Sequence, residues 1–335
     1  MTLRDALLEA ATQISRRDAE TLLAHTLHRD RAWLLAHTDD DLSATDLESL
    51  RALTTRRAAS EPLQYLTGAQ EFFGLTLRVT PDVLIPRPET EHLVEAVLDW
   101  ARTQPTSNLT IADVGTGSGA IALALAVNLP NATILATDLS PAALAVARAN
   151  AGVPTDRSSS VGWNAGVPTD GSSSAGWNSG VPTDRSSSAG WNAGVPADRS
   201  SSVGWNAERL HLASRIHFLE GDLLAPLESE VARGLRLDVL VSNLPYVAES
   251  DALTLAPEVR DHEPHLALFA GRDGLALFRR LIPRAFDALR PGGLLALEIG
   301  FGQRDPLTRL LHAWHNVRFL DDYAAIPRVA LATRP

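Results

Sequence analysis

Residues 112–126 read ADVGTGSGAIALALA, and this stretch decides the fold class of the chain. Three glycines, Gly115, Gly117 and Gly119, follow a short apolar run and precede a second one with helical composition. Glycines at such a position let the backbone turn tightly and approach a ligand, and the helix N-terminus adds partial positive charge. With Ala120 the stretch also fits the dinucleotide pattern G-x-G-x-x-G/A, so by itself it does not separate NAD from another nucleoside cofactor.

Further short apolar runs continue this pattern at residues 132–138, 215–222, 237–243 and 293–300. Segments with helix-like spacing separate the runs. Continuous apolar strands that alternate with helices indicate a parallel sheet covered on both faces. We therefore predict an α/β fold with a doubly wound, mostly parallel sheet over residues 92–335. The tail, residues 316–334, is expected to add two strands, one of them antiparallel.

The N-terminal part of the chain shows no strand pattern. Leu3, Ala6, Leu7 and Ala10 lie at i, i+3, i+4 and i+7, which is the spacing of one helix face. We predict a small helical domain over residues 1–70. Residues 71–91 alternate in the manner of strands and contain turn residues, so they are expected to form a hairpin or linker.

Residues 151–206 are four copies of a 14-residue unit that begins as AGVPTDRSSSVGWN. Each unit offers little apolar surface to offset its ordering entropy, which predicts disorder or a loose loop. The alternative is an interaction array built on the tryptophans. Joining Asn150 to Ala207 restores a continuous amphipathic helix, so the repeats interrupt an element that is complete without them. We expect this interruption to lie away from the ligand-binding edge of the sheet.

The composition excludes several classes of protein. A net charge of −10 provides no general attraction for nucleic-acid phosphates, so we expect no direct nucleic-acid partner. The absence of cysteine excludes disulfides and thiolate chemistry. No apolar run approaches the ~20 residues of a membrane span. We expect a monomeric, cytoplasmic protein that does not bind membranes.

Polar residues end three of the predicted strands, and ligands in open α/β sheets bind beyond the carboxyl ends of strands. Asp138 follows the second apolar run at the distance expected of a ribose-binding acid. It could instead cap a helix, but Ser140 before a proline fits that role better. Asp222 ends the third run and would lie near an adenine, unless it is an ordinary loop acid.

The fourth run ends in NLPY, residues 243–246. The side-chain carbonyl of Asn243 can accept from a planar NH2 group, as can a backbone carbonyl nearby. Tyr246 can pack on the flat face of an amide or a base. Such a site orients a poor nitrogen nucleophile without a strong base, so positioning should supply most of the rate gain. A dehydrogenase would need a His or Lys at these strand ends, and none is present.

The glycine turn, Asp138 and NLPY together resemble a class I, S-adenosylmethionine-dependent amino-methyltransferase with a Rossmann-like fold. VLIPRPETEHLVE (residues 83–95) and PLQYLTGAQEFFGL (62–75) are similar to one family, the HemK/PrmC protein-glutamine methyltransferases. These modify the glutamine of the Gly-Gly-Gln loop of peptide chain release factors. The resemblance covers nearly all of the chain outside the repeats, and IPRPETE is its most specific part. The related enzyme for a ribosomal protein differs there, which favours release factors as the substrate.

The resemblance implies S-adenosyl-L-methionine as cofactor and assigns site residues. The glycine turn would hold the methionine part of the cofactor, Asp138 its ribose hydroxyls, and Leu223 would lie by the adenine. The residues of that turn are Gly115, Thr116, Gly117, Ser118 and Gly119.

The NLPY residues, Asn243, Leu244, Pro245 and Tyr246, would hold the substrate glutamine, and Asn243 would also face the cofactor. The Asn243 side chain and the Leu244 carbonyl would accept from the glutamine NH2. Arg87, Glu89 and Thr90 would line the site, although Pro88 followed by acids is also a good helix start.

Two features, the insertion of residues 151–206 and a leucine in the NLPY stretch, leave alternatives open. The family pattern is Asn-Pro-Pro-Tyr, and Leu244 replaces the first proline. NLPY in this form also resembles the rRNA adenine dimethyltransferases, and a third reading is an inactive protein that only binds the cofactor. His262, Glu263 and His265 suggest a metal site, but H-x-x-H is not the i, i+4 zinc spacing, so we expect none.

Overall fold

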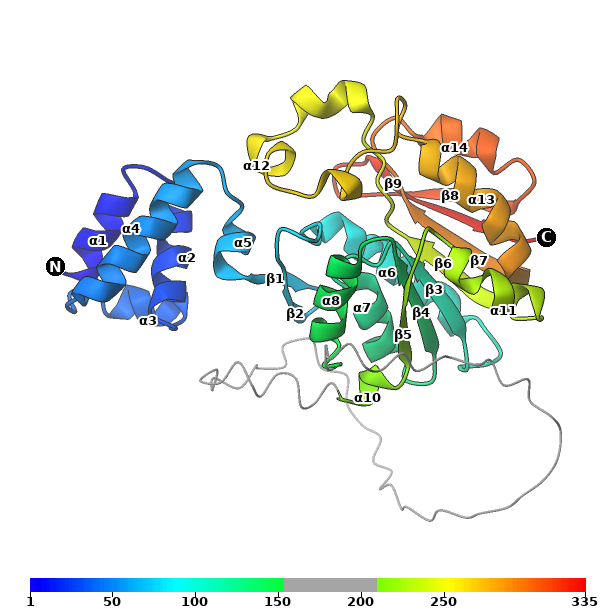
Figure 1. Cartoon of the computed structure of the whole chain (residues 1–335), viewed down its shortest axis with the longest axis horizontal. Helices are drawn as coiled ribbons and strands as arrows, with labels where there is room; N and C mark the ends of the chain where they lie inside the picture. The colour runs from blue at the N-terminus through cyan, green and yellow to red at the C-terminus, as the bar shows by residue number, and fades with distance from the viewer. Residues whose placement is uncertain (154–209) are drawn as a thin grey trace, which may run out of the picture.

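The computed structural model describes residues 1–153 and 210–335, and Figure 1 shows a helical bundle beside a larger α/β domain. The repeats from residue 154 onward, and with them the predicted disorder and the restored helix, lie outside the described residues. Within the described part, no helix is both long and apolar enough to cross a membrane.

The N-terminal bundle confirms the predicted helical region. Its helices are α1 (Leu3–Ala10), α2 (Arg16–Thr26), α3 (Arg31–Ala36), α4 (Ala44–Ala58) and α5 (Leu63–Thr67). Ser15 and Ser43 cap α2 and α4 by accepting from backbone N–H groups in the first turn. The helices enclose their own core, in which Leu3, Leu22 and Leu34 are fully buried.

A hairpin follows directly, as expected. It consists of β1 (Ala69–Phe72) and β2 (Leu75–Arg78), paired antiparallel, so it begins two residues before the predicted boundary. Phe73 and Gly74 form the turn, both with positive φ, as a type I′ hairpin turn requires. The chain then runs through η1 (Pro88–Thr90) into α6 (Glu91–Arg102), so Pro88 does begin a helical turn.

The α/β domain contains one seven-stranded sheet in the order β5-β4-β3-β6-β7-β9-β8. Its strands are β3 (Thr110–Val114), β4 (Thr133–Asp138), β5 (Ile216–Glu220), β6 (Leu237–Ser242), β7 (Leu289–Glu298), β8 (His315–Asp321) and β9 (Pro327–Thr333). Strands β3 to β7 are parallel, and β9 is antiparallel to both neighbours, which confirms the prediction.

Helices cover both faces of this sheet, as Figure 1 shows. They are α6, α7 (Ala120–Asn128), α8 (Pro141–Asn150), α10 (Leu210–Ala213), α11 (Glu228–Ala232), α13 (Ala276–Ala288) and α14 (Arg304–Leu310). The short helix α12 (Pro257–Arg260) lies instead in the connection between β6 and α13. Neighbouring strand residues serve opposite faces: Ile111 packs in the core with α6 and α7, and Ala112 in the core with α13.

The order of the strands determines where along the sheet a ligand can bind. From β3 the chain first builds outward to β4 and β5, and then returns to add β6 on the other side of β3. The sheet therefore has a topological switch point between β3 and β6. A crevice forms at the carboxyl ends of strands at such a point. The glycine turn follows β3 and NLPY follows β6, so both lie at this crevice.

Candidate functional site

A cavity of about 320 Å³ lies at the switch point. The predicted residues that line it are Gly115, Thr116, Gly117, Ser118, Asp138, Leu223, Asn243, Leu244 and Pro245. Thr90 and Asp222 line it as well. Of the other predicted residues, Gly119 forms the N-cap of α7, and Arg87, Glu89 and Tyr246 lie outside the lining. The fold thus gathers most of the predicted residues around one space.

The glycine turn is anchored to the end of β4. The backbone N–H groups of Gly115 and Thr116 both donate to the Thr137 carbonyl, at 2.8 and 2.9 Å. Gly115 and Gly117 have φ of 74° and 55°, which side chains rarely tolerate. Sequence order brings these glycines together, and the neighbouring strand holds them in place.

Asp138 ties the two predicted cofactor segments to each other. Its Oδ2 accepts from the Gly117 N–H at 2.8 Å, and its Oδ1 accepts from the Ser140 N–H at 2.8 Å. Burial raises the pKa of this carboxyl, while those N–H groups favour its charged form. Each carboxylate oxygen retains a lone pair for a further donor. Ser140 caps α8, as the sequence predicted.

Asp113 is a buried acid that the sequence reasoning missed. Its Oδ2 accepts from the Thr116 hydroxyl at 2.7 Å and from the Ala122 N–H at 3.1 Å, so it braces the turn from beneath. Its Oδ1 has no partner among the described residues. Burial raises the pKa of Asp113 to about 7. The signal was present in the sequence, since an acid stands inside an otherwise apolar strand.

Three of the four NLPY residues line the cavity, and the fourth, Tyr246, lies outside its lining. Asn243 faces the cavity and donates from its Nδ2 to the Thr90 hydroxyl at 3.1 Å. Leu244 is 3% exposed, and its side chain packs on the glycine turn. The contact is close, since a Cβ placed on Gly115 would lie only 3.2 Å from the Leu244 Cδ2. Tyr246 instead donates from its hydroxyl to Glu298 at 3.3 Å. Tyr246 is not among the residues that line the cavity, and its packing on the face of an amide or a base stays a prediction.

Glu298, the last residue of β7, is the second buried acid that sequence reasoning missed. Its Oε2 accepts from the Thr90 hydroxyl at 2.6 Å and its Oε1 from Tyr246. Burial raises the pKa of Glu298 to about 7. Its signal was again an acid that ends an apolar run.

Residues 247–270, which we call the roof segment, connect β6 to α13 and close over the cavity. They contain η3 (Glu249–Thr254), α12 and η4 (His265–Ala267). Val247 and Phe269 pair as a bridge, with hydrogen bonds of 2.9 Å on both sides. Pro264, Leu266, Ala267 and Phe269 line the cavity.

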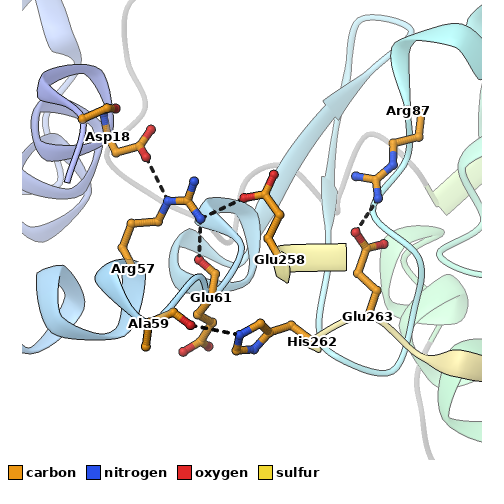
Figure 2. Close-up of polar contacts among 9 residues, drawn as sticks. Asp18, Arg57, Ala59, Glu61, Arg87, Glu258, His262 and Glu263 are labelled. Carbon is orange, nitrogen blue, oxygen red and sulfur yellow. Dashed lines mark hydrogen bonds and ion pairs between the residues drawn. The ribbon is translucent and has the colours of Figure 1, made fainter. Parts of the chain in front are cut away.

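Figure 2 shows how the roof segment is held to the loop that connects β2 to η1. Glu263, whose side chain is 1% exposed, forms an ion pair with Arg87 and accepts from the Ile85 N–H at 3.3 Å. His262 contacts the Ala59 carbonyl, and His265 the Arg260 carbonyl. His262, Glu263 and His265 therefore make structural contacts. No three His, Asp or Glu side chains in the described residues are grouped to hold a metal.

The roof segment also contacts the N-terminal bundle, through Arg57 of α4 (Figure 2). This guanidinium donates to Asp18 at 2.8 Å, to the Glu61 carbonyl at 3.0 Å and to Glu258 of α12 at 2.9 Å. One arginine thus joins two helices of the bundle to the roof of the cavity.

Comparison with known proteins adds two family models. The PrmC N-terminal domain matches residues 2–68, and the ribosomal protein L11 methyltransferase (PrmA) model matches residues 90–161. The second match covers the glycine turn and Asp138 and begins after most of the IPRPETE stretch.

Similar proteins extend over the whole chain. A release factor glutamine methyltransferase from Moorella thermoacetica is 41% identical over 100% of this chain and 99% of its own. Another, from Koribacter versatilis, is 34% identical over the same shares. A solved protein-(glutamine-N5) methyltransferase from Alicyclobacillus acidocaldarius is 23% identical over 77% of this chain and 99% of its own, with a TM-score of 0.38. The sequence matches, rather than this structural likeness, carry the comparison.

Proposed function

Because this chain belongs to the release factor glutamine methyltransferase family, we propose that it methylates the glutamine of the Gly-Gly-Gln motif in peptide chain release factors. The methyl donor is S-adenosyl-L-methionine, and the acceptor is the side-chain amide nitrogen. The observation that carries this proposal is one cavity with the glycine turn on one wall and the Asn243 amide on another.

The residues present fit the cofactor. Asp138 offers a carboxylate at the cavity wall, which suits a pair of ribose hydroxyls. The backbone of the glycine turn, without side chains at 115 and 117, leaves room for the methionine part. Leu139 and Leu223 supply an apolar wall for the adenine ring. Asp222, at the same end, forms an ion pair with Arg280.

When bound, S-adenosylmethionine supplies an electrophilic methyl group on a sulfonium. The chain's own task is to hold the glutamine amide in line with that group. The Asn243 side-chain carbonyl and the Leu244 backbone carbonyl are acceptors for the two amide hydrogens. An amide nitrogen is a poor nucleophile, so fixing its position and orientation supplies most of the rate gain.

After transfer, the N-methylated amide carries one excess proton and is a strong acid, so it gives this proton to solvent water when the product leaves, and no strong base is required next to it. The roof segment, through Leu266 and Phe269, covers the cavity with apolar side chains. This cover excludes water and strengthens each hydrogen bond to the amide.

The proposal is tested with purified chain, tritiated S-adenosylmethionine and full-length release factor. Label should enter the release factor and disappear when the glutamine of its Gly-Gly-Gln motif is replaced by alanine. Ribosomal RNA is assayed in parallel. Label in RNA alone would support an adenine methyltransferase, and label in neither would indicate a protein that only binds the cofactor.

A further inference from the structure

We infer that Glu298, acting through the Thr90 hydroxyl, determines which way the Asn243 amide faces and so makes Thr90 and Glu298 positioning residues for the reaction. This inference rests on the proposed function. It concerns three side chains that are far apart in sequence, on η1, at the end of β7 and after β6.

The contacts form a chain of hydrogen bonds behind the cavity. Asn243 Nδ2 donates to Thr90 Oγ1 at 3.1 Å, and Thr90 Oγ1 donates to Glu298 Oε2 at 2.6 Å. Tyr246 donates to the other carboxylate oxygen at 3.3 Å. Thr90 and Glu298 are both buried, so water does not compete for these bonds.

Which group donates in each of these hydrogen bonds follows from the protons that the side chains carry. An ionised carboxylate only accepts, so both hydroxyls must give their protons to Glu298. Thr90 has a single hydroxyl proton, and once this is committed its oxygen can only accept. The group of Asn243 that faces Thr90 must then be the NH2, since it is the only donor of that amide.

This orientation matters because the substrate also presents an NH2 group. With its own NH2 held by Thr90, Asn243 leaves its Oδ1 for the glutamine amide hydrogens. In the reversed amide, two NH2 groups would face each other, and the substrate hydrogen bond would be lost. The position of a nitrogen nucleophile is sensitive to such a change.

Protonation of Glu298 would permit that reversal. A neutral carboxyl can donate to Thr90, which can then donate to Asn243 Oδ1. The charged or titratable side chains that act on Glu298 are Tyr246, Arg328 and Glu89. Burial raises the pKa of Glu298 to about 7, so the carboxylate forms as the pH rises through that value. The rate should therefore rise with pH in this range.

The first test is a pair of variants at Thr90, assayed with release factor. Thr90→Val keeps the shape and removes the hydroxyl, and should lower kcat by about 10- to 100-fold. The Kd for S-adenosylmethionine should stay within about twofold. Thr90→Ser restores the hydroxyl and should bring kcat back to within about threefold of the wild type. A kcat for Thr90→Val within twofold of the wild type, or an equal loss in Thr90→Ser, would overturn the inference.

The second test is the pH profile. The rise of kcat through pH 7 should be present in the wild type and absent in Glu298→Gln, whose side chain has the same shape and does not titrate. A rise that persists in Glu298→Gln would assign it to another group, such as Asp113, and contradict the inference. If Glu298→Gln does not fold, the Thr90 pair decides alone.

The outcome separates the two proposals. A wild-type chain that labels nothing refutes the proposed function. A wild-type chain that labels release factor, with Thr90→Val equally active, refutes only the hydrogen-bond chain.

Discussion

At the scale of single residues, Leu244 is the most informative departure from the family pattern. Its side chain is buried and packs on Gly115, so it connects the predicted substrate clamp to the predicted cofactor turn. Pro245 still biases residue 244 toward extended geometry, which leaves the Leu244 carbonyl available. The leucine therefore retains both acceptors of the clamp and lacks only the rigidity of a second ring.

Leu244→Pro should raise kcat modestly, by about two- to threefold, because the ring stiffens the clamp. It should also lower the free energy of unfolding by about 1 kcal/mol, because buried carbon atoms are lost against Gly115. Methyl transfer and urea unfolding measure the two effects. Leu244→Ala is the matched control, with the lost packing and no ring. Activity that appears only in Leu244→Pro would mean that the natural chain is inactive.

At the scale of elements, the end of α8 is more closely tied to the site than the sequence suggested. Asn150 is the last residue of this helix and is 4% exposed. Its side chain accepts from the Arg78 N–H at 2.7 Å and donates to the Arg78 carbonyl at 3.0 Å and to the Ser118 carbonyl at 2.9 Å. The insertion was expected away from the ligand-binding edge, yet the residue before it holds the glycine turn.

Asn150→Ala should therefore weaken binding of S-adenosylmethionine by about 5- to 10-fold, since Ser118 loses a buried partner. Isothermal titration calorimetry measures the affinity. Asn131→Ala is a suitable control, because its side chain makes one exposed hydrogen bond to Ser107. If stability falls while the affinity stays unchanged, the contact with Ser118 serves only folding.

The roof segment depends on the ion pair between Arg87 and Glu263. Arg87→Ala should lower the free energy of unfolding by about 2 kcal/mol or more, because it leaves a buried carboxylate without its partner. Adding Glu263→Gln to this variant should recover part of the loss. Arg102→Ala removes an exposed pair with Asp99 and should cost less than about 1 kcal/mol. Urea unfolding distinguishes these outcomes, and equal losses in both arginine variants would contradict the role of burial.

At the scale of the whole molecule, the question is whether the repeats can be removed. Ala151, the first repeat residue, is fully buried in the core beside α7, and Val153 packs against the same core. Deletion of residues 151–206 places Ala207 after Asn150, so an alanine again follows the helix. A connection shortened in this way changes closure entropy only logarithmically.

The deletion of 151–206 should keep the affinity for S-adenosylmethionine within about threefold of the full chain. Removing one residue more, 150–206, also removes Asn150 and should weaken binding as Asn150→Ala does. The two deletions differ by a single side chain, so calorimetry on both separates the repeats from the residue that precedes them. A large loss in the shorter deletion would show that the repeats themselves support the site.

The sequence by itself determined the parallel sheet, the helical N-terminal region and the glycine turn. These follow from local patterns, in which apolar runs alternate with helices and glycines stand at a strand end. It also placed Asp138 and Asn243 at one edge, because the carboxyl ends of parallel strands share that edge.

Only the tertiary structure decided which side chains act together. Thr90 and Glu298 are separated by 208 positions, and Asn243 and Thr90 by 153, so no periodic pattern relates them. In the sequence, Asp113 and Glu298 are isolated acids in apolar runs. In the folded chain both are buried, and each accepts a hydrogen bond from a threonine hydroxyl. The Tyr246 hydroxyl donates to Glu298 for the same reason. A buried charge must find its hydrogen-bond donors within the folded chain, and only packing decides which donors are near.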